Sequence, residues 1–358
     1  MDITSRLTGE KPRKPLYQRI ILVGLAVGII ISLIVLYTYY NRIFSPNVHI
    51  SGGNEASIII PKGSDFNNVK SILYSSGLIR NKRAFEWVAR QKQYPSLIKP
   101  GHYTLRSGMN NNDLVNMLRS GAQTPVNVVF NNIRTKEQLA GRISQQIEAD
   151  SLSLVRCWND PQYVRSLGFT PASITAMFIP NTYEMWWTSD AKEFTERMNR
   201  EYMRFWDGTR SDKARAMNMN PMQVIILASI VEEETEKSED MPVIAGVYIN
   251  RLKKGWPLQA DPTLKYAVGN YDLKRVLNVH KEVDSPYNTY KNTGLPPGPI
   301  CIPSISAIDA VLDYRKHDYM FFCAKADMSG YSAFARTLAE HNRNAHAYQA
   351  ALDRKGIQ

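Results

Sequence analysis

Apolar residues form one uninterrupted segment near the N-terminus and recur periodically elsewhere in the chain. Residues 20–40 contain no charged side chain and consist mainly of Ile, Leu, Val, Gly and Ala. A helix of about 21 residues crosses a hydrocarbon core of roughly 30 Å. The pattern therefore predicts a transmembrane helix over residues 20–40, with residues 1–19 as a tail before it.

Charges on the two sides of this segment predict its orientation. Five basic residues precede it, against two acidic ones, and they are Arg6, Lys11, Arg13, Lys14 and Arg19. After the segment, Arg42 is followed by no further Lys or Arg until Lys62. The positive-inside rule therefore predicts a cytoplasmic N-terminus, and it places the remainder of the chain on the extracytoplasmic (periplasmic) side of the cell inner membrane.

A cleaved signal peptide is the alternative for such a segment, because it also combines a basic start with an apolar run. The run here is longer than the apolar part of a typical signal peptide. It ends in Tyr37, Tyr39 and Tyr40, an aromatic belt typical of a membrane interface, and no small-residue cleavage site follows. We therefore expect a retained single-pass anchor.

A short pattern of strand, turn and helix recurs three times between residues 57 and 147. The strand-like runs are residues 57–60, 102–105 and 126–130. The helices that follow carry apolar residues at a spacing of three or four, namely Val69, Ile72 and Leu73, then Leu114, Met117 and Leu118, then Leu139, Ile143 and Ile147. The first two helices are followed by Gly77 and Gly121, which are expected C-terminal stops. The pattern predicts a small α+β domain over residues 41–148.

The remainder of the chain reads as a connector and a second domain. Residues 149–170 show no strong period and are interpreted as the connector. From residue 171 to residue 358, helical periods combine with one strand-like run at residues 319–323, so the fold class is again α+β. Helices are expected at residues 191–205, 221–235, 241–254, 304–314 and 338–355.

The helix at 221–235, PMQVIILASIVEEET, is the most informative segment. Its apolar residues share one helical face, namely Val224, Leu227, Ala228 and Val231, and Glu234 is the next position on that face. Glu232, Glu233 and Glu236 are expected to fall away from it. A carboxylate that continues a core face loses water, which raises its pKa toward the range that a general acid needs. The alternative is that this acidic run is the solvated end of an amphipathic helix.

Several further motifs accompany this helix along the chain. They are FIPNTY at 178–183, VYINRL at 247–252, LQADPT at 258–263, SPYNTY at 285–290, GLPPGPI at 294–300 and EHN at 340–342. In order and approximate spacing, over roughly residues 55–352, they resemble the endolytic murein (peptidoglycan) transglycosylases of the MltG/YceG-like family. In that family the catalytic acid/base is the second glutamate of a Glu-x-Glu-Thr signature that follows Ala-Ser-Ile. Here this residue is Glu234.

The resemblance implies a fold and a reaction. It implies a LysM-like module for residues 41–148, although Asn131 and Asn132 stand where the family commonly has an acidic residue and a glycine. For residues 171–358 it implies a catalytic domain of a membrane-anchored lytic transglycosylase, a lyase of cell wall biogenesis. Such an enzyme cleaves the MurNAc-β-1,4-GlcNAc bond in nascent peptidoglycan and leaves 1,6-anhydro-MurNAc ends. Glu234 would act as general acid/base, and no second carboxylate is required because the sugar C6 hydroxyl is the nucleophile.

Polar residues in the motifs are the expected substrate contacts. Asp261 precedes a proline, so a turn-forming or substrate-orienting role is favoured over a second catalytic acid. Residues 294–299 are interpreted as a cleft wall, with a rigid structural corner as the alternative. At least two of Tyr183, Trp186 and Trp187 are expected in the core. The expected substrate-binding residues are Gln259, Asp261, Thr263, Asn288, Thr289, Tyr290 and Asn342.

Cysteine and histidine usage bounds the remaining chemistry. The chain has three cysteines, Cys157, Cys301 and Cys323. A Cys301–Cys323 bridge is one alternative, but free thiols are favoured because Cys323 lies in an apolar strand. His341 has no second His or Cys at ligand spacing, so no metal is expected, and no cofactor either.

Charge and topology together define the expected partners. The chain of 358 residues has 44 basic and 33 acidic residues, a net charge of +11 and a pI near 9.4. Nucleic-acid binding is excluded by the predicted topology, since the basic excess lies away from the cytoplasm. The expected partners are therefore peptidoglycan glycan strands, the membrane with its anionic headgroups, and cell-wall synthases.

Two other functions stay open at the level of sequence. One is a non-catalytic glycan-binding scaffold of the cell-wall synthesis machinery, which the intact Glu-Glu-Glu-Thr signature argues against. The other is a hydrolytic muramidase that uses Glu234 with Asp261, and the separation of the two carboxyl groups would decide this.

Overall fold

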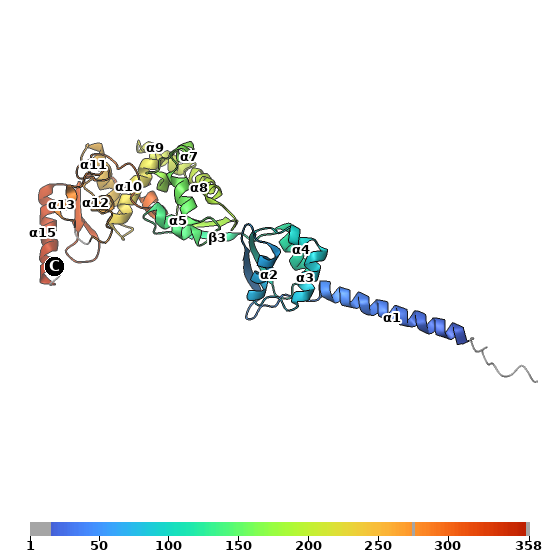
Figure 1. Cartoon of the computed structure of the whole chain (residues 1–358). Helices are drawn as coiled ribbons and strands as arrows, with labels where there is room; N and C mark the ends of the chain where they lie inside the picture. The colour runs from blue at the N-terminus through green and yellow to red at the C-terminus, as the bar shows by residue number, and fades with distance from the viewer. Residues whose placement is uncertain (1–15, 274–275, 356–358) are drawn as a thin grey trace, which may run out of the picture. The chain divides into compact units, whose positions relative to one another are not determined.

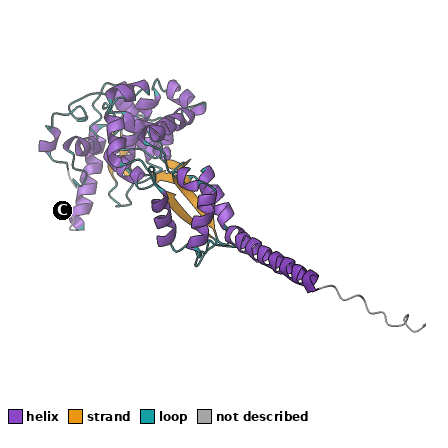
Figure 2. Cartoon of the chain, turned by 45° about the vertical axis from the view of Figure 1, so that its right-hand side comes forward, coloured by secondary structure: helices purple, strands orange, loops and turns teal. Residues whose placement is uncertain are grey.

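The structure, a computed structural model, describes residues 16–273 and 276–355 (Figure 1). Of the basic residues that predict the orientation of the anchor, Arg19 is described, whereas Arg6, Lys11, Arg13 and Lys14 lie outside the described residues. The chain divides into two compact units, Met1–Thr124 (unit 1) and Pro125–Gln358 (unit 2). Helices predominate and the strands form small antiparallel pairs, so the fold is α+β (Figure 2).

The predicted membrane segment is one continuous helix, α1 (Leu16–Phe44), which extends the expected span at both ends. Its best window has a mean hydropathy of 3.0, and the side chains from residue 16 to residue 40 are exposed. The helix is long and apolar enough to cross a membrane.

Unit 1 contains the first two strand–helix repeats, and their strands pair with each other. Strand β1 (Glu55–Ile60) runs antiparallel to β2 (Gly101–Arg106), with Ile60 opposite Gly101. Each strand is followed by a capped helix. The helices are α2 (Phe66–Ser75), which starts at the Asp65 cap, and α4 (Asn111–Ser120), which starts at the Asn110 cap and ends at Gly121 with φ of 75°.

The sequence pattern missed one helix of unit 1, α3 (Lys82–Gln91), and the short helix η1 (Tyr94–Ser96). Only two large apolar side chains of α3, Phe85 and Val88, are buried, so its period is easily overlooked. They pack in a core with side chains of both strands and of α2 and α4. This core includes Ile58, Ile60, Val69, Leu73, Tyr103, Leu105, Leu114 and Leu118.

The third strand–helix repeat belongs to unit 2, so the expected domain boundary at residue 148 differs from the observed division after Thr124. Strand β3 (Val126–Phe130) pairs antiparallel with β4 (Asn181–Met185), in which the FIPNTY motif ends. The helix of this repeat is α5 (Lys136–Ser144). Periodicity identifies a strand but not its partner, and here the partner lies about 50 residues further along the chain.

Residues 149–170 are a packed part of unit 2 and not a simple connector. They form α6 (Ser151–Asn159) and α7 (Pro161–Ser166), each started by an aspartate cap. Leu154, Trp158 and Val164 are fully buried, and the Trp158 ring lies 4.9 Å from that of Phe178. The short length of the two helices explains why no long period is visible in the sequence.

The longer helices of unit 2 agree with the sequence prediction within two residues at each end. They are α8 (Ala191–Phe205), α10 (Pro221–Glu234), α11 (Met241–Lys253), α14 (Ile305–Leu312) and α15 (Leu338–Arg354). The expected strand is β5 (Phe321–Ala324), which pairs with β6 (Ser332–Ala335). The other helices of unit 2 that were not predicted are η2 (Ile174–Met177), α9 (Thr209–Ala216), α12 (Asp261–Val268) and α13 (Asn278–Lys281).

Helix α10, yellow in Figure 1, is the central helix of unit 2. All eight residues from Val224 to Val231 are buried, and the helix contacts α11, α12 and α14. The expectation of a single apolar face is therefore wrong, because neighbouring helices cover α10 on several sides. Its Asn220 cap fixes the start of the helix, and its C-terminal end at Glu234 reaches the candidate site.

Candidate active site

A cavity of about 680 Å³ opens at the C-terminal end of α10. Three segments that are distant in sequence form its walls. The first is the loop between β3 and α5, from Asn131 to Arg134, and the second is the run from Glu232 to Glu236. The third includes Cys301, Ile302 and Ser304, and Lys265 of α12 also lines the cavity. The cavity is therefore rich in charged and polar side chains.

The three consecutive glutamates at the end of α10 have different partners. Ser304 donates a hydrogen bond from Oγ to Oε2 of Glu232 over 2.6 Å. Arg134 donates two bonds to Glu233, of 3.2 and 3.0 Å. Tyr248 donates its hydroxyl proton to Oε1 of Glu234.

The alternative that this acidic run is the solvated end of an amphipathic helix does not hold for Glu232 and Glu233, because both are only partly exposed and both are bonded to other segments. Successive residues of a helix point about 100° apart, and the end of α10 is surrounded by protein in each of these directions.

Glu234 has the electrostatic properties of a general acid. Loss of water on burial is the main cause that raises its pKa from 4.5 to about 7. The charge of Asp261 raises the pKa further, whereas the Tyr248 hydrogen bond and the charges of Arg251 and Lys265 lower it. The neutral carboxylic acid is therefore well populated near neutral pH.

Tyr248 and Arg251 of α11 act on this carboxyl group, and neither was among the predicted site residues. The Tyr248 side chain is almost fully buried, and burial followed by the charge of Glu234 raises its pKa well above its usual value. Tyr248 is thus a permanent donor. Arg251 is also buried and donates to the carbonyl oxygens of Met320 and Leu258. Both residues lie in the VYINRL motif, which was the sequence feature that could have indicated their role.

Two of the expected substrate-binding threonines are buried and hold loops together. The Thr263 hydroxyl donates to the Ala260 carbonyl over 2.7 Å, and Oγ1 of Thr289 accepts from the Ala260 amide over 3.0 Å. The two hydroxyl groups lie 2.8 Å apart. The structure therefore places Thr263 and Thr289 beneath the surface, where their polar atoms are already occupied.

Asn288 has a similar position inside its loop. Its Nδ2 donates to the carbonyls of Lys281 and Val283, over 2.9 and 2.8 Å, and its Oδ1 accepts from the Tyr290 amide over 3.0 Å. The side chain is fully buried. Its amide thus shapes the loop that presents Tyr290.

Asp261 is exposed and bonds to Tyr290 instead of local backbone amides. It is the first residue of α12, and its Oδ1 accepts the Tyr290 hydroxyl over 2.6 Å. The expected Asp-Pro turn is therefore the start of a helix, in which the side chain of Asp261 reaches another loop. Gln259 just before α12 is exposed and has φ of 49°, and its amide donates to the Thr289 carbonyl over 3.0 Å.

Asn342 is exposed on α15. Its neighbour His341 stacks on Phe321 with ring centroids 5.4 Å apart. All seven expected substrate-binding residues lie within the described residues, and none of them lines the 680 Å³ cavity itself. Asp261 is the one whose charge raises the pKa of Glu234.

The loop of Asn131 and Asn132 lines the cavity, although the sequence analysis attached no ligand contact to it. Asn132 has φ of 51°, in the left-handed region that glycine adopts without strain and asparagine tolerates. This conformation explains why asparagine can stand where the family commonly has glycine.

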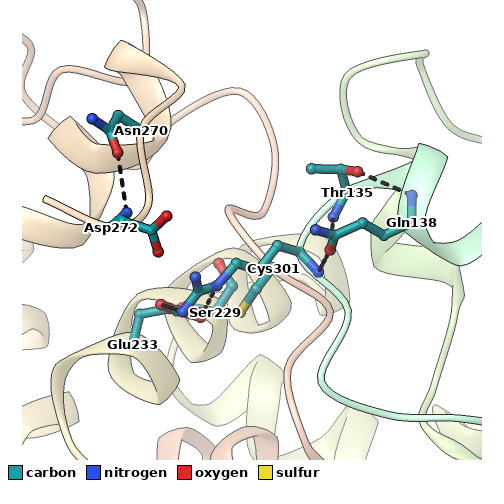
Figure 3. A network of polar contacts seen from close by, with 8 residues as sticks. Thr135, Gln138, Ser229, Glu233, Asn270, Asp272 and Cys301 are labelled. Carbon is teal, nitrogen blue, oxygen red and sulfur yellow. Dashed lines mark hydrogen bonds and ion pairs between the residues drawn. The ribbon is translucent and has the colours of Figure 1, made fainter.

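Two contacts fasten this loop to the remainder of the site. The Arg134 amide donates to Oε1 of Gln138 over 3.0 Å, and the Ile302 amide donates to the Ile133 carbonyl over 2.8 Å. Figure 3 shows Gln138, Glu233 and Cys301 gathered around this junction. With the ion pair between Arg134 and Glu233, the three walls of the cavity are tied together.

Ser229 connects the third wall to α10. Its Oγ accepts the Ile300 amide over 3.0 Å, and its carbonyl accepts the Cys301 thiol over 3.4 Å. Cys157, Cys301 and Cys323 are all free, so the alternative of a Cys301–Cys323 bridge is not realised. Burial raises the pKa of the Cys301 thiol well above its usual value.

Residues 294–299 form the approach to this wall and pack as a tight corner. A Cβ atom on Gly298 would lie 2.2 Å from the Ala172 carbonyl oxygen. Within the described residues, the cavity is lined by Cys301, Ile302 and Ser304 and not by residues 294–299. Gly294, Leu295 and Pro296 instead line a separate cavity of about 530 Å³, so this segment is both a tight corner and a wall of that second cavity.

Tyr183, Trp186 and Trp187 do not line the cavity. Tyr183 is buried and stacks on Phe130 with centroids 5.8 Å apart. Trp186 is 53% exposed and Trp187 is partly exposed, so the expectation that at least two are core residues is wrong. Strand β4 ends at Met185, and both tryptophans follow it.

Comparisons with known proteins give a consistent assignment. A model of the YceG-like family matches residues 58–347. An endolytic murein transglycosylase of Bacillus subtilis strain 168 is 30% identical over 314 residues, which cover 84% of this chain and 86% of the relative. An endolytic murein transglycosylase of Streptococcus pneumoniae strain D39 is 29% identical over 315 residues, or 80% of this chain and 57% of that protein. A crystal structure of a YceG-like protein from Listeria monocytogenes has a TM-score of 0.54 at 29% identity, and covers 81% of this chain and 98% of its own.

Proposed function

The chain belongs to the YceG-like family, and from this premise we propose that it is an endolytic murein transglycosylase, a lytic enzyme that acts on peptidoglycan strands. One observation supports this most strongly. Glu234 at the end of α10 has a pKa raised to about 7, and it lines a cavity of about 680 Å³. A carboxylic acid that is neutral near pH 7 beside a cavity is suited to protonate a leaving group.

The proposed reaction cleaves the MurNAc-β-1,4-GlcNAc bond. Glu234 donates its proton to the departing O4 of GlcNAc as the bond to C1 of MurNAc breaks. The resulting carboxylate then takes the proton from the C6 hydroxyl of the same MurNAc, whose oxygen bonds to C1. The products are a free GlcNAc 4-hydroxyl and a 1,6-anhydro-MurNAc end. No water is consumed, and Glu234 finishes in its starting protonation state.

Tyr248 has a defined part in this cycle. It donates to Oε1 of Glu234, so the proton of the neutral acid resides on the other carboxyl oxygen. The same hydrogen bond stabilises the carboxylate that forms after the first proton transfer. Tyr248 thereby orients the acid and limits how far its pKa rises.

Three carboxylates near Glu234 are already bonded to other side chains, which favours a one-acid mechanism, and Glu236, which also lines the cavity, is exposed. Glu232 and Glu233 are bonded to Ser304 and Arg134, and Asp261 is bonded to Tyr290. A hydrolase normally needs a second carboxylate that is available to activate water or attack the sugar. An intramolecular nucleophile removes that requirement, which supports the lytic reaction over a muramidase.

We further propose that α1 anchors the enzyme in the cell inner membrane with a cytoplasmic N-terminus. The apolar length of α1 and the basic residues before it support this orientation. The candidate active site would then face the extracytoplasmic side, where glycan strands are made. Cell-wall synthases are the expected neighbours there.

Product analysis tests this proposal. Purified full-length protein is incubated with purified peptidoglycan, and the new ends are analysed by mass spectrometry. We expect 1,6-anhydro ends, which lack one water relative to reducing ends, and internal cleavage of long strands. Reducing ends as the main product would instead establish hydrolysis, and failure to cut with intact folding would favour a binding scaffold.

A further inference from the structure

The C-terminal end of α1 packs directly on unit 1, without a flexible linker. The Tyr39 ring lies 5.2 Å from the Trp87 ring of α3. The Arg42 carbonyl accepts a bond of 2.8 Å from Nδ2 of Asn111, at the start of α4. Asn47, just beyond the helix, is buried and donates to Oδ1 of Asn111 over 2.6 Å. These contacts fix the orientation of α3 relative to α1.

Trp87 identifies the face of α3 that lies beside the anchor. It contacts Tyr39, and the Arg42 guanidinium lies 5.8 Å from the centre of its ring. Tyr39 belongs to the aromatic belt at the end of the apolar run, and such belts lie at the level of lipid headgroups. If α1 spans a membrane, as proposed above, Trp87 is therefore held at headgroup level as well.

The same face of α3 carries two arginines. Arg83, Trp87 and Arg90 are spaced at i, i+4 and i+7, so they lie along one side of the helix. Arg83 and Arg90 are exposed, whereas Ala84, Phe85, Val88 and Ala89 on the opposite side are buried. We call Arg83, Trp87 and Arg90 the α3 outer face.

Positive charge is concentrated around this face. Residues 80–92 contain five basic residues and one acidic residue, whereas the whole of residues 41–124 contains eleven basic and four acidic ones. Glu86 lies 3.5 Å from Arg90, an exposed ion pair that leaves most of the guanidinium accessible. Arg83 has no hydrogen-bond or ion-pair partner among the described residues of this unit.

We propose that the α3 outer face docks on anionic phospholipid headgroups of the membrane that α1 spans, an inference that rests on the proposed anchor. Charged faces of helices usually contact only solvent. The α3 outer face differs because the contact between Trp87 and Tyr39 holds it beside the aromatic belt of α1. Tryptophan favours the interface, and guanidinium groups bind phosphate oxygens in bidentate geometry. Docking would hold unit 1 in one orientation at the membrane surface.

The experiment uses the full-length protein in nanodiscs and measures fluorescence quenching of Trp87. Two nanodisc preparations carry a spin label on the headgroup of either phosphatidylglycerol or phosphatidylcholine. The Trp87→Phe variant is measured in parallel, and its fluorescence is subtracted because it comes from the other five tryptophans. We expect labelled phosphatidylglycerol to quench Trp87 more strongly. Arg83→Gln with Arg90→Gln should reduce this preference roughly 25-fold, since each basic residue at an anionic surface contributes about fivefold.

Two further double variants serve as controls. Arg83→Lys with Arg90→Lys keeps both charges and should retain most of the preference. Arg106→Gln with Arg119→Gln removes two exposed charges elsewhere on unit 1 and should leave the preference unchanged. Folding of every variant is compared by circular dichroism.

Three results would overturn the inference. They are equal quenching by the two lipids, an undiminished preference in the glutamine variant, and a charge effect that appears only when soluble peptidoglycan fragments are added. The last result would identify stem-peptide carboxylates as the partner. A protein that fails to co-elute with nanodiscs would instead refute the anchor, so the two failures are distinguishable.

Discussion

The Tyr248 hydroxyl on α11 donates a hydrogen bond to Oε1 of Glu234, the last residue of α10. Tyr248 is buried and Glu234 is partly buried, and the raised pKa of the phenol keeps it a hydrogen-bond donor. The bond therefore fixes one oxygen of Glu234 as an acceptor and leaves the other to exchange protons. This relationship leads to the first two predictions.

Tyr248→Phe should shift the alkaline limb of the pH–rate profile to higher pH. The hydrogen bond from Tyr248 lowers the pKa of Glu234, so its removal raises that pKa above about 7. The acid then stays protonated to higher pH, while the lost orientation lowers the maximal rate. Measuring kcat/KM against pH for both proteins checks this, because that ratio reports on the free enzyme. A limb that moves to lower pH would contradict the assignment.

Glu234→Gln should abolish glycan cleavage and stabilise the folded protein above pH 7. In the wild type the folded pKa is raised from 4.5 to about 7, so the folded state binds more protons between these values. Wild-type stability consequently falls as pH rises through this window, and glutamine avoids that loss. The gain should be about 1 to 3 kcal/mol above pH 7 and should vanish below pH 4.5, as measured by chemical denaturation.

Glu232→Gln and Glu233→Gln are the matched controls for that experiment. Both side chains are bonded to neighbouring residues of the cavity wall, so some loss of rate is expected from a looser site. Both variants should nevertheless keep measurable cleavage. Full activity in Glu234→Gln together with an inactive Glu232→Gln would show that the wrong glutamate has been assigned.

Asp261→Asn and Lys265→Met should move the alkaline limb in opposite directions. The charge of Asp261 raises the pKa of Glu234 and the charge of Lys265 lowers it. Removing the anion therefore shifts the limb to lower pH, and removing the cation shifts it to higher pH. In both variants the product should remain the 1,6-anhydro end. Loss of all product in Asp261→Asn, from a wild type that makes reducing ends, would identify a two-carboxylate muramidase.

Arg134→Gln should lower activity more than it lowers stability. The ion pair with Glu233 is partly exposed, with 40% and 24% of the two side chains accessible, so its loss should cost only about 0.5 to 1 kcal/mol. The pair also holds the loop of Asn131 and Asn132 against α10, and a mobile loop should raise KM. In a double-mutant cycle with Glu233→Gln, the effects on KM should be less than additive. Additive effects would show that the two side chains act independently.

Gly298→Ala should destabilise unit 2 strongly, whereas Gly141→Ala should not. A Cβ on Gly298 would meet the Ala172 carbonyl oxygen at 2.2 Å, a backbone atom that cannot move aside easily. We expect a loss of about 2 kcal/mol or more in the free energy of unfolding. Gly141 lies in α5 with no atom within 4 Å of its Cβ position, so alanine should add about 0.5 to 1 kcal/mol of helix stability. Equal effects of the two substitutions would refute the close packing of residue 298.

The sequence by itself determined the local elements and indicated one candidate site residue. Charge-free apolar length specified α1, and helical periods specified α8, α10 and α11 to within a residue or two, because these signals depend only on neighbours along the chain. The placement of Glu234 after an apolar face already implied an acid withdrawn from water. The structure gives this carboxyl group a raised pKa, although α10 proved to be buried on several sides.

Tertiary structure decided which distant segments meet. No local pattern predicts that β3 pairs with β4 or that Asn132 and the end of α10 line one cavity. Nor does one predict that Glu233 pairs with Arg134 and Glu234 with Tyr248. The same limit explains why Thr263, Asn288 and Thr289 read as substrate contacts but lie buried within loops. The sequence does not distinguish a polar side chain that faces a ligand from one that bonds to a backbone carbonyl. Only the packing of the surrounding segments determines which partner its hydrogen-bonding atoms meet.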